Sequence, residues 1–293
     1  MNRFRHFAAV DWSGAAGERQ RGIAVAICGE GDEAPRLVRP DRAWSRAEVL
    51  EWLADHLPEA TLAGLDLGMS LPFTDRGAFF PGWSLSPPDA RALWALVDAI
   101  CEEDDHLAAT SFVDHPEASR FFRRHGGREG DLFGAEGLPG GRGRFRVTEH
   151  AQRAVGCNLY SNFNLVGAAQ VGKSSLTGMR VLHRLAGRLP VWPVDPVPQG
   201  SSAVVEIYTS IAAIHAGRRA GRTKLRSVEE LNHALAALGS RPVSGSGMLD
   251  DHRCDALLTA AWLRRAAPRE DYWRPPGMTP HIATTEGWTF GAR

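Results

Sequence analysis

The sequence predicts an α/β fold with ordered elements at both ends of the chain and a long segment of different character between them. The first part reads as three strands, a helix and a fourth strand, and the last third again contains strand and helix patterns. The 293 residues are 43% hydrophobic and 23% charged, the composition of a globular protein that can bury a core. This length fits one large domain or two small ones, and we expect one domain with an insertion at about residues 73–200.

Four short apolar runs predict the strands of the first part. They are residues 4–11, 21–28, 36–39 and 61–67, and the third is the weakest. Before the fourth run, Ser45 and Glu48 have the spacing of a capping box, in which each side chain accepts a hydrogen bond from the other residue's backbone amide. The apolar residues that follow recur at helical spacing, so a helix is predicted to begin there.

The central segment carries weaker signals. Pro87 and Pro88 open a predicted helix that runs to about Glu103, and residues 110–113 fit a short strand. Residues 117–153 contain eight glycines and eight arginines against five acidic residues, which favours a mobile loop region.

The last third returns to regular patterns. Residues 203–208 predict a strand, and Ser227 with Glu230 forms a second capping-box pattern at the start of a helix. Residues 250–267 predict a strongly amphipathic helix. The tail, residues 282–290, is expected to form a final hairpin or to cover a sheet edge.

Charge and cysteine content exclude several classes of protein. The basic and acidic residues balance, 34 against 34, which counts against a non-specific binder of long polyanions. Only two of the basic residues, Lys173 and Lys224, are lysines. The four scattered cysteines have no paired zinc-site spacing and indicate buried free thiols. No segment resembles a signal peptide or a membrane span, so we expect a cytoplasmic protein without membrane contact.

Acidic residues stand at the ends of two predicted strands and at the start of one predicted helix. Asp11 and Asp66 close their apolar runs, and strand ends are where open α/β sheets bind ligands. Asp251 and Asp255 are four residues apart, so both project from one face of the late helix. Carboxylates that converge in this way are what a pair of divalent metal ions needs, and oxygen ligands favour Mg²⁺ or Mn²⁺.

Each acidic residue also has an ordinary structural interpretation. Asp250 and Asp251 suit the first turn of a helix, where negative charge complements the helix dipole, and Asp11 suits a turn. Glu206 interrupts an apolar run. It is therefore either a further catalytic acid from a third strand or an acid paired with one of the many arginines.

The order of these segments resembles the ribonuclease H-like fold, and more closely a family described as predicted nucleases with that fold. The resembling segments are residues 9–14, 64–72, 146–149, 167–172, 205–208, 251–263 and 286–291. The resemblance implies a mixed sheet, with three antiparallel strands followed by parallel strands, flanked by helices and carrying a large central insertion. It also implies a metal-dependent hydrolase site at Asp11, Asp66 and Asp251 or Asp255.

A second motif points to different chemistry. The segment that begins at Gly167 and ends at Ser174 matches the P-loop pattern G-x-x-x-x-G-K-[ST], which cradles nucleotide phosphates. The residues before it are poor in β-branched side chains, and only one clear strand follows it, too few to complete a nucleotide-binding sheet. We therefore favour a glycine-rich loop that contributes Lys173 to the carboxylate site.

Three functions stay open on the sequence. The first is a phosphodiesterase or nuclease that uses Mg²⁺ or Mn²⁺, with Arg146, Glu149 and Lys173 contacting a phosphate-containing substrate such as nucleic acid or a nucleotide. The second is nucleotide binding or phosphotransfer, through the P-loop-like segment or through a distant likeness to actin and sugar kinases. The third is a non-catalytic RNase H-like module that binds a partner.

Overall fold

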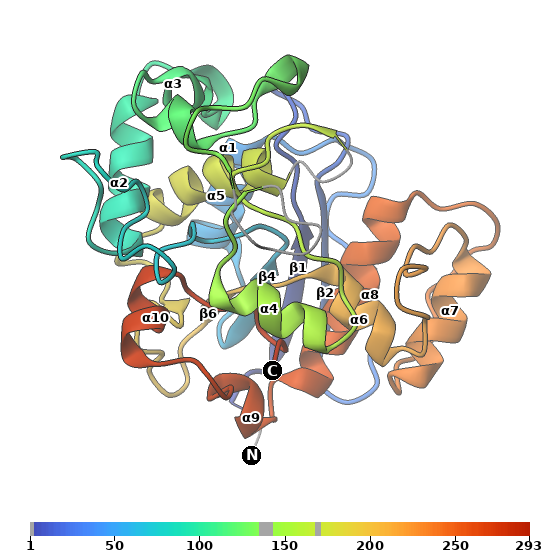
Figure 1. The fold of residues 1–293 in the computed structure, drawn as a ribbon. Helices are drawn as coiled ribbons and strands as arrows, with labels where there is room; N and C mark the ends of the chain where they lie inside the picture. The colour runs from blue at the N-terminus through green and yellow to red at the C-terminus, as the bar shows by residue number, and fades with distance from the viewer. Residues whose placement is uncertain (1–2, 135–142, 168–170) are drawn as a thin grey trace.

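The computed structural model describes residues 3–134, 143–167 and 171–293 (Figure 1). Within these residues the strands form one mixed sheet in the order β3-β2-β1-β4-β6-β5. They are β1 (His6–Asp11), β2 (Ala24–Gly29), β3 (Arg36–Leu37), β4 (Thr61–Leu65), β5 (Val191–Trp192) and β6 (Ala203–Glu206). β2 runs antiparallel to β1 and β3, whereas β1, β4, β6 and β5 are mutually parallel.

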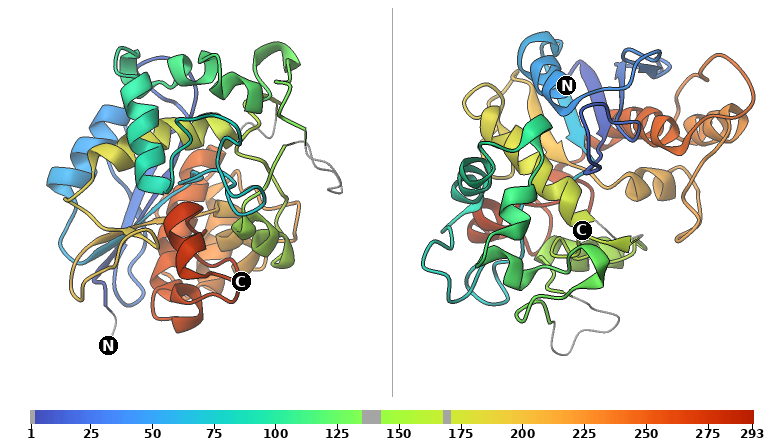
Figure 2. Two further views of the ribbon diagram at one scale, coloured as in Figure 1. Left: turned by 60° about the vertical axis from the view of Figure 1, so that its left-hand side comes forward. Right: turned by 90° about the horizontal axis from the view of Figure 1, so that it is seen from above.

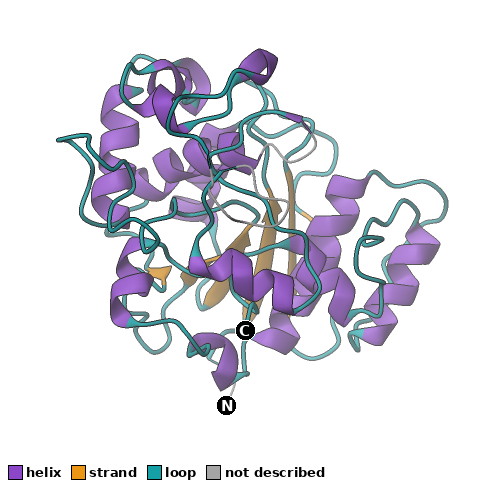
Figure 3. Ribbon diagram, viewed as in Figure 1, coloured by secondary structure: helices purple, strands orange, loops and turns teal. Residues whose placement is uncertain are grey.

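Helices cover both faces of this sheet (Figures 2 and 3). The first helical layer is α1 (Arg46–Glu51), η1 (Trp52–His56), α2 (Ala90–Ile100) and α5 (Val171–Arg184). The second is α6 (Thr209–His215) and α8 (Asp251–Ala266), with α7 (Val228–Ala237) packed on α8. Because side chains alternate along a strand, Ala8 and Val10 of β1 join the core under the first layer, while Phe7 and Ala9 join the core under the second.

The strands predicted in the first and last parts of the chain are confirmed, most of them a few residues shorter than their apolar runs. The capping box at Ser45 and Glu48 is present with both hydrogen bonds. At Ser227 only half of the predicted box forms, because Glu230 accepts its hydrogen bond from the amide of Arg226 instead. The predicted late helix is confirmed as α8, which begins after its N-cap residue Asp250.

Three predictions for the rest of the chain are wrong in their secondary structure. Residues 110–113 lie in the helix α3 (Thr110–Asp114), whose Phe112 is buried against Phe80 and Phe122. The glycine- and arginine-rich stretch contains α4 (Val147–Ala154) as well as loops. The tail forms α10 (Pro280–Thr285) rather than a hairpin, although Thr289 then pairs with the end of β6. The other short helices are η2 (Asp105–Leu107), η3 (Ala118–Phe121), η4 (His125–Gly127) and α9 (Glu270–Trp273).

Two sequence expectations about the whole molecule can be compared with the structure. The four cysteines, Cys28, Cys101, Cys157 and Cys254, are free and buried, as expected. In the described part of the chain, no helix combines the length and the apolar surface needed to cross a membrane.

Candidate functional site

Asp11 and Asp66 lie side by side at the carboxyl ends of two neighbouring parallel strands. Val10 pairs with Leu65 in the β1–β4 ladder, and the amide of Asp66 continues it by donating to the carbonyl of Val10 at 2.9 Å. Both carboxylates lie on the α8 side of the sheet. Asp11 Oδ1 is 3.3 Å from His252 Nδ1, and Thr209 Oγ1 of α6 is 3.5 Å from Asp66 Oδ2.

The first turns of α8 bring two more carboxylates to this edge, those of Asp251 and Asp255. Their neighbour Asp250 caps the helix by accepting a hydrogen bond from the amide of Arg253, so its role is structural. Lys224, from the loop between α6 and α7, lies 2.6 Å from Asp255 Oδ2 and 3.5 Å from Asp251 Oδ2. The sequence interpretation missed Lys224 and His252. The signal for Lys224 was its rarity, since it is one of two lysines in a chain whose other basic residues are arginines.

The members of this carboxylate cluster (Asp11, Asp66, Asp251 and Asp255) repel one another when they are ionised, which changes their pKa values. Burial, with Asp11 and Asp255 nearby, raises the pKa of Asp66 well above its usual range. Burial also raises the pKa of Asp11, and that of Asp255 to about 6, despite their cationic neighbours. The hydrogen bond that His252 donates to Asp11 raises the pKa of His252 to about 9, so this histidine is protonated at neutral pH.

A completed metal shell is not present among the described residues, where no group of three or more histidines, cysteines or acidic residues is arranged around a common point. The contacts within the cluster explain this arrangement. Asp11 is turned to His252, and Asp255 is turned to Lys224. The donor set itself consists of carboxylate oxygens, and the Asp66 carboxylate has no hydrogen bond shorter than the 3.5 Å to Thr209 Oγ1 among the described residues. This donor chemistry fits a hard divalent cation.

Glu206 belongs to a different group on the other face of the sheet. It pairs with Leu65, one residue before Asp66, so the alternation of side chains directs it away from α8. There it is buried and accepts hydrogen bonds from the Arg146 guanidinium at 2.7 and 2.8 Å and from the amide of Met69 at 2.7 Å. Of the two interpretations of Glu206, the structure shows the acid paired with an arginine.

Arg146 is buried at the centre of this second group, and its donors are used within it. Besides Glu206, it contacts Glu149 through Nε at 2.8 Å and the carbonyl of Glu286 through Nη1 at 2.9 Å. Burial, opposed by Arg146, raises the pKa of Glu149 above its usual range. A phosphate could reach Arg146 only by displacing these carboxylates. We therefore assign Arg146 and Glu149 a positioning role in the fold, in place of the substrate contact expected from the sequence.

Other arginines of residues 117–153 are also engaged. Arg120 pairs with Asp131 at 2.8 Å, and Arg144 pairs with Asp75 at 2.6 Å. These ion pairs leave fewer guanidinium groups free for phosphate than the composition of the stretch suggested.

The P-loop-like segment falls partly outside the described residues, since residues 168–170 are not among them. Before it, Asn164 forms only an isolated bridge with Arg123, where a P-loop requires a strand. Its last part is the first turn of α5, which packs on the turns after β1 and β4. A Cβ at Gly14 would lie 2.5 Å from the backbone of Lys173, and the amide of Gly68 donates to Ser175 Oγ at 3.2 Å. Lys173 therefore lies next to the turn that follows Asp11.

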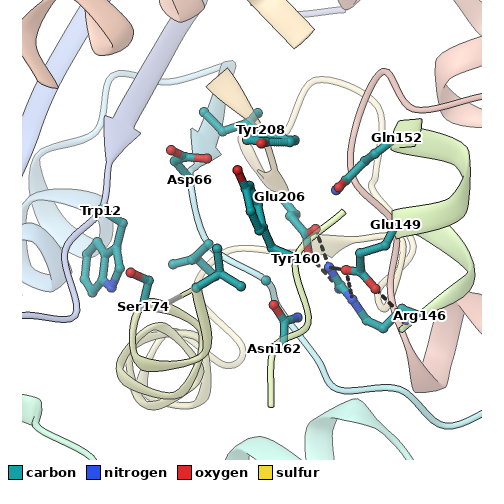
Figure 4. A pocket seen from close by; sticks show the side chains of 14 residues that line it. Trp12, Asp66, Arg146, Glu149, Gln152, Tyr160, Asn162, Ser174, Glu206 and Tyr208 are labelled. Carbon is teal, nitrogen blue, oxygen red and sulfur yellow. Dashed lines mark hydrogen bonds and ion pairs between the residues drawn. The ribbon is translucent and has the colours of Figure 1, made fainter. Parts of the chain in front are cut away.

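A cavity of about 150 Å³ joins the two groups (Figure 4). Asp66 stands at one end of it, and Arg146 and Glu149 stand at the other. Tyr160 and Tyr208 lie between these ends.

Comparison with known proteins gives no family for this chain. No protein-family model matches it, and neither the curated proteins nor the solved structures include a significant match.

Proposed function

We propose that this protein is a phosphodiesterase or nuclease of the RNase H-like fold that works with a divalent metal ion at the carboxylate cluster. The observation that carries the proposal is the convergence of Asp11, Asp66, Asp251 and Asp255 from β1, the end of β4 and α8. Burying carboxylates beside one another costs free energy, and it raises the pKa values of Asp66 and Asp255. Such perturbed carboxylates are typical of functional sites, where binding a ligand offsets the cost.

The charge of the cluster supports a divalent ion. When ionised, the four carboxylates bring four negative charges, while Lys224 and protonated His252 bring two positive ones. Two negative charges are left over, which one Mg²⁺ or Mn²⁺ balances. Asp11, Asp66 and either Asp255 or Asp251 would hold the ion. When bound, it would polarise a phosphoryl oxygen and activate a water molecule.

The cationic side chains around the cluster suit the substrate. Lys224 is half exposed beside Asp255, so its ammonium group can reach a phosphate placed over the cluster. When His252 is protonated, Nδ1 donates to Asp11, and Nε2–H stays able to donate to a substrate oxygen. Lys173, whose backbone lies against the Gly14 turn, is a candidate for a third cation.

Nucleotide binding or phosphotransfer is a second candidate, favoured by one observation. The turns at Gly14 and Gly68 both lie against the first turn of α5, and the start of a helix is a place where proteins commonly bind phosphate. The absence of a strand before this turn within the described residues makes it the weaker candidate.

Cleavage of bis(4-nitrophenyl) phosphate and of short single-stranded oligonucleotides with Mn²⁺ tests the proposal. We expect Asp66→Asn to lose activity by about 100-fold or more, because it removes one metal ligand. Asp271→Asn is the matched control, since Asp271 is an acid in a surface ion pair with Arg269 and Arg293. Activity that is absent from the wild type, or equal in Asp66→Asn and the control, would reject the proposal.

A further inference from the structure

The cavity beside Asp66 has the size of one ring rather than of a whole ligand. Its volume is about 150 Å³, below the roughly 300–1,000 Å³ of pockets that enclose drug-sized molecules. Asp66 belongs to the carboxylate cluster and also lines one end of the cavity. A substrate whose phosphate lies over the cluster would therefore place its adjoining group in the cavity. The cavity is therefore a candidate subsite for the part of the substrate next to its phosphate.

Aromatic side chains form part of the lining. Trp12, Tyr160 and Tyr208 come from three separate segments, and Tyr160 stands near the middle of the view in Figure 4. Both tyrosines are partly exposed. Aromatic faces beside a narrow space favour a flat ligand ring, because every nucleobase has a π-face that can stack on an aromatic side chain.

Two buried amide groups line the same cavity, and their oxygens accept no hydrogen bond from the described residues. Asn162 is 3% exposed and donates through Nδ2 to the carbonyl of Ser70 at 2.9 Å, and its oxygen points toward the cavity in Figure 4. Gln152 is 7% exposed and donates through Nε2 to Thr289 Oγ1 at 2.7 Å. No side-chain or backbone group in the described residues donates a hydrogen bond to Asn162 Oδ1 or Gln152 Oε1.

The hydrogen-bond network fixes the orientation of the Gln152 amide. Thr289 has one hydroxyl proton, which it gives to the Glu206 carboxylate. Its oxygen must therefore accept from Gln152, so the amide nitrogen of Gln152 faces Thr289 and the amide oxygen is left for another donor. Arg146 holds Glu206 in place from the other side. The buried ion pair thus fixes the orientation of an amide that lines the cavity.

We propose that this cavity binds one unpaired nucleobase that carries an exocyclic amino group, as adenine and cytosine do. The amino group would donate to Gln152, and the ring would lie against Tyr160 or Tyr208. A base in this position cannot be paired, because its amino edge is occupied, so the substrate is a nucleotide or a single strand rather than a duplex. This inference rests on the proposed function for the placement of the phosphate, but binding of the base does not require the metal.

Calorimetric titration of nucleosides in EDTA tests the inference. We expect cytidine and adenosine to bind at least about tenfold more tightly than uridine and inosine, which carry a carbonyl group in place of the amino group. Gln152→Met keeps the shape of the side chain but removes its acceptor, and should abolish this preference. Tyr160→Ala should weaken all four nucleosides, and Tyr160→Phe, which keeps the ring, should not.

Equal binding of amino and carbonyl nucleosides, no binding of any nucleoside, or equally tight binding of free ribose would overturn the inference. A parallel Mn²⁺ titration separates it from the proposed function. An amino preference without Mn²⁺ binding rejects the metal-dependent function but supports the base site, whereas Mn²⁺ binding without an amino preference rejects the base site alone.

Discussion

Replacing Arg146 with methionine should destabilise the protein strongly, because Arg146 is the cation of a buried ion-pair group. Its side chain is 1% exposed, and those of its partners Glu206 and Glu149 are 2% and 4% exposed. Arg146→Met would leave these carboxylates buried without a counter-charge, a change that costs about 3–5 kcal/mol of unfolding free energy. For a chain of this size, that corresponds to a fall in Tm of roughly 6–20 °C.

Thermal and urea unfolding followed by circular dichroism measures this effect. The direction of its pH dependence follows from the pKa of Glu149, which burial raises already in the wild type. Without Arg146 the carboxylates favour protonation still more, so the loss should be smaller at pH 5 than at pH 8. Arg120→Met is the matched control, because the Arg120–Asp131 pair is exposed and screened by solvent, and it should change stability little. If Arg146→Met is no more harmful than this control, the assignment of a positioning role to Arg146 is wrong.

Two further predictions concern the candidate site. Gly14→Ala would place a Cβ 2.5 Å from the backbone of Lys173, and should destabilise the protein by about 1–3 kcal/mol in urea unfolding, whereas Gly134→Ala, which meets no atom within 4 Å, should not. NMR titration of His252 should give a pKa of about 9 in the wild type and a value near 6.5 in Asp11→Asn, since the hydrogen bond to Asp11 causes the shift. The stabilisation from this contact is complete below about pH 6.5 and is lost as the pH rises through about 9, and an unchanged pKa in the variant would refute the contact.

Patterns with a simple period were sufficient to predict the sheet and the positions of most of the acidic residues. The apolar runs that end at Asp11 and Asp66 place both carboxylates at one edge, and the spacing of Asp251 and Asp255 places both on one face of α8. What these patterns do not contain is the register between strands. Glu206 pairs with Leu65 rather than with Asp66, and this offset of one residue moves its carboxylate to the opposite face of the sheet.

Contacts between distant loops also escaped prediction. Lys224 reaches Asp255 from a loop with no periodic pattern, and only its rarity among the basic residues marked it. Residues 110–113 have a strand-like composition, but they lie in the short helix α3. This helix places Phe112 against the rings of Phe80 and Phe122. In such cases tertiary packing overrides local propensity, and a single sequence does not reveal it.

The binding of Mn²⁺ to the carboxylate cluster is the most direct test of the proposed function. Calorimetric titration of the wild type, Asp66→Asn and Asp271→Asn measures it without a substrate. We predict that the wild type and Asp271→Asn bind Mn²⁺ alike and that Asp66→Asn binds at least about tenfold more weakly, with more protons released by the wild type at pH 6 than at pH 8, because the pKa of Asp255 is about 6. Mn²⁺ affinity that is unchanged in Asp66→Asn would contradict the placement of the metal site.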